Sequence, residues 1–479
     1  MDVELRKTFD KMFSPQSIAI VGISRIHSGL GGQFFLQNLR RASYPGRIYL
    51  VNRNADEIMG LRAYPSVSSL PEAVDLCILC LPAQFVPATL GECRRKGIRN
   101  IHVLSSGFKE IGTAEGARLE DEIAEEARAG ELNIVGPNCM GPYVPSSRLM
   151  LWGLIPANPG PFAFLSQSGT LTQRMTEYAA FKGMGLSKAI SFGNATVLGS
   201  TDYLEYLAGD EETRVVGFYL ESVRDGRRFL EVARRVNAQK PLIVWKGGET
   251  PSGAGVVASH TGTLSGEDTI WENGLKQAGV TRARSLEEIT GTAMAFLNLP
   301  PPQGRRLFIL GGGGGNSVYF ADICIRVGLQ IPLLAGVTRE RITQLVPAVG
   351  SFARNPVDSW RSFHDPEYLA QILELVFQDP TLDMILLDRL IPRSTYATSE
   401  EPDAPSRVIA YLQQNRWRKP LVLVVDGSGD DPVLAGEAAQ IRQQFGQAGI
   451  PTFSSLPMAA RALVHLADYY EKKATRGRI

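Results

Sequence analysis

The sequence of 479 residues has few cysteines, and they are too scattered to form a disulfide framework. The five are Cys77, Cys80, Cys93, Cys139 and Cys324. Such a distribution favours a reduced, cytoplasmic protein over a secreted one. Cys77 and Cys80 form a single Cys-x-x-Cys spacing inside an apolar run, which indicates core residues, and we expect no metal site.

The chain also lacks an excess of either charge and has no long apolar run. Lys and Arg total 50 and Asp and Glu total 49, so charge gives no reason to expect nucleic acid or an anionic membrane as a partner. No stretch approaches the roughly 18 uncharged apolar residues of a membrane-spanning helix, and residues 1–13 are unlike a signal peptide. A phosphate-bearing ligand would therefore need a local site.

Glycine is abundant instead, at 48 residues, which suggests many tight strand-to-helix turns. Short runs rich in Val, Ile and Leu alternate with helical patterns, as in doubly wound parallel sheets of the α/β class. Proline-rich breaks at 136–160 and 300–302 predict three consecutive αβ domains, at 1–140, 141–299 and 303–479. Strands are expected at 17–23, 47–51, 75–81, 100–104, 132–135, 162–166, 188–192, 214–220, 241–246, 306–310, 382–388 and 420–426.

The first predicted strand leads into a glycine-rich turn between Gly22 and Gly32. A turn of this kind, followed by a helix N-terminus, favours a nucleotide phosphate. Its spacing is not a regular G-x-G-x-x-G, and the second strand ends in Asn52 and Arg53 without the acidic residue that binds the ribose of NAD. The pattern disfavours an NAD dehydrogenase and leaves NADP or another phosphorylated nucleotide open.

Two strand ends of the second domain carry polar residues. The sequence from Ser166 through Ser168 and Gly169 to Thr170 combines hydroxyls with a helix start, which suits an anion, although simple N-capping explains it equally well. Glu221 follows another strand at the edge where parallel sheets present functional groups, and a solvated strand-end carboxylate is the alternative.

Residues 246–266 contain six glycines and one imidazole, that of His260. This composition predicts a mobile loop. Because the neighbours of His260 are Ser, Thr and Gly, they provide neither an apolar core nor a metal-ligand cluster, and the imidazole is a candidate nucleophile towards a phosphoryl group. Its second nitrogen would then need a carboxylate or carbonyl partner.

Together these motifs resemble the alpha subunit of the ADP-forming acyl-CoA synthetases, which are relatives of succinyl-CoA synthetase. The resemblance is close over residues 13 to about 360. It rests on eight blocks in the family's order: SIAIVGISR (17–25), VNRNADEIMGLRAYPSV (51–67), SGFKEIG (106–112), GPNCMG (136–141), FLSQSGTL (164–171), YLESVRDGRRF (219–229), SHTGTLSG (259–266) and NPVD (355–358). The glycine run 311–315 and the segment 194–198 depart from the family pattern, and the second departure bears on the acyl pocket or a subunit contact.

The resemblance implies a Rossmann-like CoA-binding domain followed by two flavodoxin-like ligase domains. The implied reaction converts acyl-CoA, ADP and phosphate reversibly to a carboxylic acid, CoA and ATP, through an acyl phosphate and a phosphohistidine. His260 would carry the phosphoryl group, and Glu221 would steady it. The phosphate cradle would be Ser166, Ser168, Gly169 and Thr170, and CoA would lie against Gly22, Ser24, Arg25, Asn52, Pro82, Ala83, Gly107, Glu110, Asn138 and Cys139.

The sequence shows no candidate for the ATP-grasp domain with which the family binds ADP and magnesium. The resemblance therefore implies a separate beta subunit and a heterotetramer. Two other functions stay open. One is a CoA-binding regulatory protein without turnover, against which the joint presence of His260, Glu221 and Ser168 argues; the other is an NADP-linked oxidoreductase, supported only by the Gly22 turn and Arg53.

Overall fold

The computed structural model describes residues 3–24, 29–153, 158–261, 266–311, 313–334, 336–346, 353–363, 365–388, 404–415, 418–427 and 431–476. The chain forms two compact units, the first of residues 1–180 and 185–284 and the second of residues 181–184 and 285–479. The described part of the first unit contains two seven-stranded sheets, and that of the second contains one five-stranded sheet.

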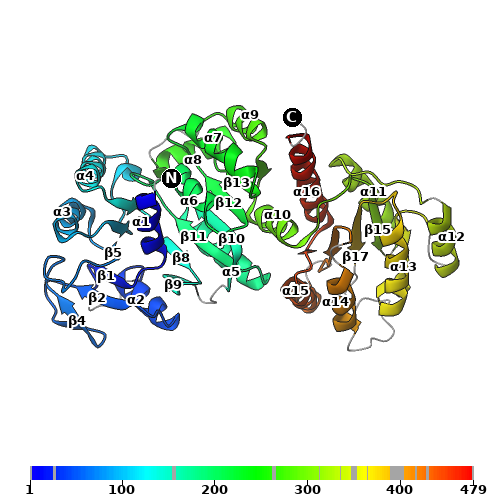
Figure 1. The fold of residues 1–479 in the computed structure, drawn as a ribbon, viewed down its shortest axis with the longest axis horizontal. Helices are drawn as coiled ribbons and strands as arrows, with labels where there is room; N and C mark the ends of the chain where they lie inside the picture. Colours follow the sequence, from blue (N-terminus) through cyan, green and yellow to red (C-terminus); the bar gives the residue numbers. More distant parts are fainter. Residues whose placement is uncertain are drawn as a thin grey trace. The chain divides into compact units, whose positions relative to one another are not determined.

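The first sheet has the strand order β3-β4-β2-β1-β5-β6-β7 (Figure 1, blue to cyan). Without the antiparallel β3 its six parallel strands run 3-2-1-4-5-6, the order of Rossmann folds. Its elements are α1 (Val3–Phe13), β1 (Ser17–Val21), α2 (Gly32–Arg41), β2 (Arg47–Val51), β3 (Glu57–Ile58), β4 (Leu61–Tyr64), β5 (Leu76–Leu79), η1 (Ala83–Phe85), α3 (Val86–Lys96), β6 (Asn100–Val103), η2 (Lys109–Ile111), α4 (Ala114–Gly130) and β7 (Asn133–Val135). Strands β1, β5 and β6 are buried along their whole length because helices cover both faces.

The second sheet has the order β14-β13-β12-β10-β11-β8-β9. Its five parallel strands follow the flavodoxin order 2-1-3-4-5, with β10 as the first strand, and the antiparallel β8 and β9 extend the edge beside β11. Its elements are β8 (Gly141–Val144), β9 (Leu149–Met150), β10 (Pro159–Ser166), α5 (Gly169–Phe181), β11 (Leu186–Ser191), α6 (Ser200–Ala208), β12 (Val215–Leu220), α7 (Gly226–Asn237), β13 (Leu242–Lys246), α8 (Pro251–Thr261), α9 (Asp268–Ala278) and β14 (Thr281–Ala283). Helix α1 contacts β6 of the first sheet and β8 of the second and lies between them (Figure 1).

The third sheet has the order β16-β15-β17-β18-β19, again 2-1-3-4-5. Its elements are α10 (Leu286–Asn298), β15 (Leu307–Gly311), α11 (Gly314–Arg326), α12 (Gly336–Leu345), β16 (Val357–Asp358), η3 (Trp360–Phe363), α13 (Pro366–Gln378), β17 (Met384–Asp388), α14 (Ala404–Asn415), β18 (Leu421–Val424), α15 (Pro432–Gln447), β19 (Thr452–Phe453) and α16 (Leu456–Arg476). Its core combines strand residues such as Phe308 and Ile385 with helix residues such as Ile372 and Phe445. Three doubly wound sheets confirm the predicted fold class, whereas the domain boundaries taken from the prolines stay a prediction.

Two expectations need correction. The irregular, proline-rich stretch at 136–160 contains β8 and β9, which join the second sheet as short antiparallel strands, with β9 at its edge. The loop predicted for 246–266 is wrong for Pro251–Thr261, which form helix α8. Proline suits the first position of a helix, and Thr250 caps this end, since its Oγ1 accepts a hydrogen bond from Gly253 N at 3.1 Å.

Candidate functional site

The turn after β1 crosses the point where the first sheet reverses its strand order. Gly22 has a φ of +84°, and a Cβ there would lie 2.5 Å from Cys80 O at the end of β5. Only glycine fits this close approach without strain. The crevice between β1 and β5 is the place where open α/β sheets bind nucleotides.

Two adjoining cavities lie along this edge, and half of the predicted CoA residues line them. Gly22, Ser24 and Pro82 line both, whereas Asn52 lines one and Asn138 the other. Ala83 begins η1, next to Pro82. A Cβ at Gly107 would come within 3.1 Å of the Ala83 Cβ, so the loop that follows β6 closes over the same edge. Arg25 lies outside the described residues.

Two of the predicted CoA residues have structural partners of their own. Glu110 Oε1 accepts hydrogen bonds from Gly107 N at 2.6 Å and Phe108 N at 3.1 Å, which shapes the loop. The thiol of Cys139 donates to Val103 O at 3.6 Å, and burial raises its pKa. Cys139 is therefore a neutral core thiol in this structure.

In the second sheet, β10 and β12 are neighbours at the point where the strand order reverses, and the two predicted polar strand ends meet there. Ser166 Oγ accepts a hydrogen bond from Ser168 N at 2.9 Å. Ser168 Oγ accepts one from Leu171 N at 3.3 Å and thereby caps α5. A Cβ at Gly169 would lie 2.9 Å from Met140 Cγ, so this helix start lies against the GPNCMG segment. Thr170 is exposed.

Glu221 follows β12 directly and is 5% exposed. Its Oε1 accepts a hydrogen bond from Tyr219 OH at 3.2 Å. Burial first, and then the Glu221 charge, raise the pKa of Tyr219, which keeps the phenol a donor. A buried carboxylate at a switch point can hold an imidazolium or phosphohistidine ring in place.

Gln167, a residue that sequence reasoning did not single out, joins the ends of β10 and β12. Its Oε1 accepts hydrogen bonds from Glu221 N at 2.7 Å and Ser222 N at 3.0 Å. The only sequence signal was its position between the two serines of the FLSQSGTL block. This amide fixes the relative position of the candidate cradle and the candidate carboxylate.

His260 is the penultimate residue of α8, and its side chain lies outside the described residues. Helix α8 packs against η2, the segment that follows the SGF turn of the first sheet. The helix that carries His260 therefore contacts the loop predicted to bind CoA. Lys246, the last residue of β13, lies before the start of α8. Its side chain is buried and donates a hydrogen bond to Gly248 O at 2.7 Å, and burial lowers the pKa of this amine.

Asn194, which follows β11 of the second sheet, contacts the loops at the CoA edge of the first sheet. Its Nδ2 donates to Glu110 Oε2 at 2.7 Å and Glu120 Oε2 at 2.9 Å, and its Oδ1 accepts from Asn138 Nδ2 at 3.4 Å. It also lines a polar cavity of about 520 Å³ that reaches Gln167 and Ser222. The CoA edge of the first sheet and the switch point of the second thus form one continuous region.

Within the described ranges, no group of three or more His, Cys, Asp or Glu residues could hold a metal ion. No helix of the part that the structure describes is long and apolar enough to span a membrane.

Comparison with known proteins decides the family. Residues 16–144 match the model of a CoA binding domain, and residues 159–296 match that of the succinyl-CoA ligase like flavodoxin domain. The alpha subunit of acetate–CoA ligase [ADP-forming] II from Pyrococcus furiosus is 34% identical over 96% of this chain and 98% of its own. The isoenzyme I alpha subunit of the same organism is 33% identical over 98% and 99%.

The chain belongs to the ADP-forming acyl-CoA synthetase family. A solved acetyl-coenzyme A synthetase from Ca. Korarchaeum cryptofilum, in complex with phosphate and ADP, has 29% identity and a TM-score of 0.85, with 98% of both chains covered. The resemblance read from the motifs is confirmed: the synthetase chain is an alpha-type subunit of a CoA ligase. The NADP-linked oxidoreductase loses its support.

Proposed function

We propose that this alpha subunit transfers a phosphoryl group, on His260, between an acyl phosphate and ADP held by a partner subunit. The observation that carries the proposal is the hydrogen bonding of Gln167 to the backbone of Glu221 and Ser222, which joins the Ser166–Ser168 turn to the buried carboxylate. Helix α8, which carries His260, is attached at the same edge of the sheet.

In the proposed sequence, phosphate attacks the thioester carbonyl, the C–S bond breaks, and CoA leaves as the thiolate. The His260 imidazole then attacks the phosphorus of the acyl phosphate, and the carboxylate leaves. ADP accepts the phosphoryl group from the imidazole to give ATP. Overall, acyl-CoA, ADP and phosphate give the acid, CoA and ATP, so no oxidant or further reactant is needed.

The described residues support distinct tasks in this scheme. The backbone N–H groups at the start of α5 and the hydroxyl of Ser168 would hold phosphate, since helix N-termini favour anions. Glu221 would orient the His260 ring and offset its positive charge. Gly22, Ser24, Asn52 and Asn138 would receive CoA along the two cavities of the first sheet.

ADP and Mg²⁺ would bind to an ATP-grasp beta subunit, and the complete enzyme would be a heterotetramer in the cytoplasm. The alpha-subunit names of the two Pyrococcus furiosus relatives support a partner. All five cysteines are free thiols, as expected in a reducing compartment. Acetate, which those relatives' names give, is the first acid to test.

The test is phosphorylation of the assembled enzyme by ATP labelled in the γ-phosphoryl group. We expect an acid-labile, base-stable label on His260 that His260→Asn abolishes and His364→Asn, in the other unit, retains. The label should disappear when the carboxylic acid substrate and CoA are added at neutral pH, because the phosphoryl group then passes from His260 to the carboxylate. A protein that binds CoA yet takes no label would be the regulatory alternative, and equal labelling of His260→Asn would refute the role of this imidazole.

A further inference from the structure

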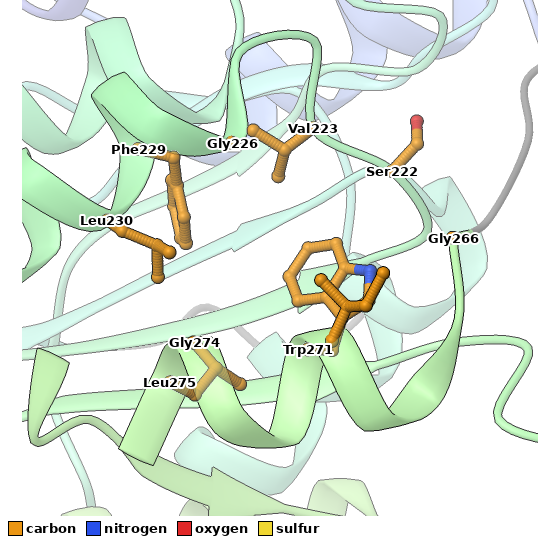
Figure 2. A pocket seen from close by; sticks show the side chains of 10 residues that line it. Ser222, Val223, Gly226, Phe229, Leu230, Gly266, Trp271, Gly274 and Leu275 are labelled. Atoms are coloured by element: carbon orange, nitrogen blue, oxygen red, sulfur yellow. The ribbon is translucent and has the colours of Figure 1, made fainter. Parts of the chain in front are cut away.

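Helices α7 and α9 flank a small apolar cavity of about 160 Å³ that lies beside the proposed site and opens to solvent at one side (Figure 2). The side chains of Val223, Phe229, Leu230, Ile270 and Trp271 line it. In Figure 2 the rings of Phe229 and Trp271 and the branched side chains of Val223 and Leu230 surround the same space. Phe229 and Trp271 have ring centroids 6.4 Å apart and an interplanar angle of 57°. Such a lining suits hydrocarbon and offers little to a phosphate.

The cavity lies at the end of β12. Ser222, which lines it, directly follows Glu221, and Gln167 Oε1 accepts hydrogen bonds from both backbone N–H groups. Gly266, on another side of the cavity, is six residues beyond His260 in the chain. The cavity wall therefore includes the residue that follows Glu221 and the glycine at which the chain continues into α9 after the His260 segment.

Its size sets the group that it can hold. An engineered protein cavity of about 150 Å³ with an apolar lining binds benzene. The cavity between α7 and α9 has a similar volume, although it is open at one side, and two aromatic rings, whose tilted arrangement favours contact with another ring. Acetate has only a methyl group and would leave most of this space empty.

We propose that this cavity receives the hydrocarbon end of the acyl group, so that the synthetase prefers monocarboxylic acids ending in a phenyl ring, or a branched alkyl group of that size, to acetate. The inference rests on the proposed function, because it assigns the acid of that reaction. It adds a specificity site formed by α7 and α9, with Leu230 and Trp271 as its principal contacts.

The first measurement compares kcat/KM for acetate, 3-methylbutanoate and phenylacetate, with CoA and ATP, in the enzyme assembled with its ATP-grasp partner. We expect phenylacetate or 3-methylbutanoate to exceed acetate by about tenfold or more, the usual discrimination of an apolar pocket for an extra hydrocarbon group. A preference for acetate would overturn the proposal while leaving the phosphohistidine function intact.

Two substitutions of one residue change the space in opposite directions. Leu230→Trp should lower kcat/KM for phenylacetate by about tenfold and leave that for acetate within about twofold, because only the larger acid needs the cavity. Leu230→Ala should admit a larger acid such as a naphthylacetate. Leu333→Trp, at an exposed leucine of the other unit, is the matched control and should leave all acids unchanged.

Direct binding separates this inference from catalysis. The ¹⁹F signal of 4-fluorophenylacetate should broaden with the assembled wild-type enzyme and with His260→Asn, but not with Leu230→Trp. Binding that Leu230→Trp does not reduce would place the ring elsewhere and refute the cavity. Binding that Leu230→Trp abolishes, in an enzyme without a His260 label, would support the cavity and refute the proposed carrier.

Discussion

The side-chain oxygen of Gln167 accepts a hydrogen bond from the backbone N–H of Glu221 at 2.7 Å. The bond joins the ends of β10 and β12, two neighbouring strands whose residues are 54 positions apart in the sequence. Gln167 is 6% exposed and Glu221 is 5% exposed. A buried backbone donor that loses its acceptor costs about 1–3 kcal/mol. The amide of Gln167 therefore fixes the backbone that carries Glu221 next to the turn proposed to bind phosphate.

Replacement of Gln167 should thus affect phosphoryl transfer more than folding. We expect Gln167→Ala to slow labelling of His260 by about tenfold, because it releases the backbone of Glu221 and leaves one buried and one partly buried donor without their acceptor. Rapid-quench measurement of the labelling rate checks this. Gln173→Ala, which removes an exposed contact with Glu177 on α5, should label at the wild-type rate; equal rates for both variants would contradict the role.

Sequence reasoning found the long parallel strands because continuous apolar runs are typical of strands buried on both faces. β2 has the predicted bounds 47–51, and the other predicted strands differ by a few residues. β8 and β9 were missed because both are short. β8 also contains Pro142, which argues against a strand paired on both sides, as β8 is with β11 and β9.

The missed parts of the site depend on tertiary contacts. Helix α8 was predicted as a loop because its glycines lower helix propensity, yet a Thr250 cap and packing against η2 stabilise it. Gln167 carried no signal of its own, since a glutamine in a turn has many uses. The joint role of His260 and Glu221 came from the order of the family's motifs, because no local pattern links two residues so far apart in sequence, and it stays a prediction.

Arg282 of β14 should position the segment that carries His260. Its guanidinium, 9% exposed, pairs with Glu249 at 3.1 Å, with Asp268 at 2.5 Å and with Glu272. Burial alone would lower the pKa of Arg282, and the hydrogen bonds from its three partners raise it instead. Since Glu249 precedes α8 and Asp268 begins α9, one cation holds both flanks of the segment.

Arg282→Met should lower the free energy of unfolding by about 1–3 kcal/mol, because it removes the charge-assisted hydrogen bonds of a buried guanidinium to three partly exposed carboxylates. Arg282→Lys should recover part of this but little of the His260 labelling rate, since an ammonium cannot contact three carboxylates in a plane. Urea unfolding and single-turnover labelling check the two effects. Arg118→Met, at an exposed pair with Glu115, should cost about 1 kcal/mol or less; an equal cost for Arg282→Met would disprove the anchoring role.

Gly22→Ala should abolish CoA binding. The new Cβ would lie 2.5 Å from Cys80 O and 2.7 Å from Leu81 Cδ2, so the turn and the end of β5 must separate. Gly97→Ala is the control, because Gly97 lies outside the two cavities and also has a positive φ, of +81°, but a Cβ there meets no atom within 4 Å. Calorimetric titration with CoA should show no heat for Gly22→Ala and a Kd near the wild-type value for Gly97→Ala, whose cost is backbone strain of about 1 kcal/mol. Comparable loss of CoA binding in both variants would show that close approach at Gly22 is not required.

The stability of the first sheet should fall as the pH is lowered from about 6.5 to 4, through His102 of β6. Burial lowers the pKa of this imidazole from 6.5 to about 4, although its hydrogen bond with Cys139 O partly opposes the shift. In this pH range the unfolded chain binds a proton at His102 and the folded protein does not. Lowering the pH from 6.5 to 4 should therefore reduce the free energy of unfolding by about 3 kcal/mol. His102 Nε2 donates a hydrogen bond to Cys139 O at 3.0 Å, and a proton added at Nδ1 leaves this bond in place. His102→Gln keeps a donor and should remove this pH dependence from the urea midpoint, and an NMR titration of His102 with a midpoint near 6.5 would contradict its burial.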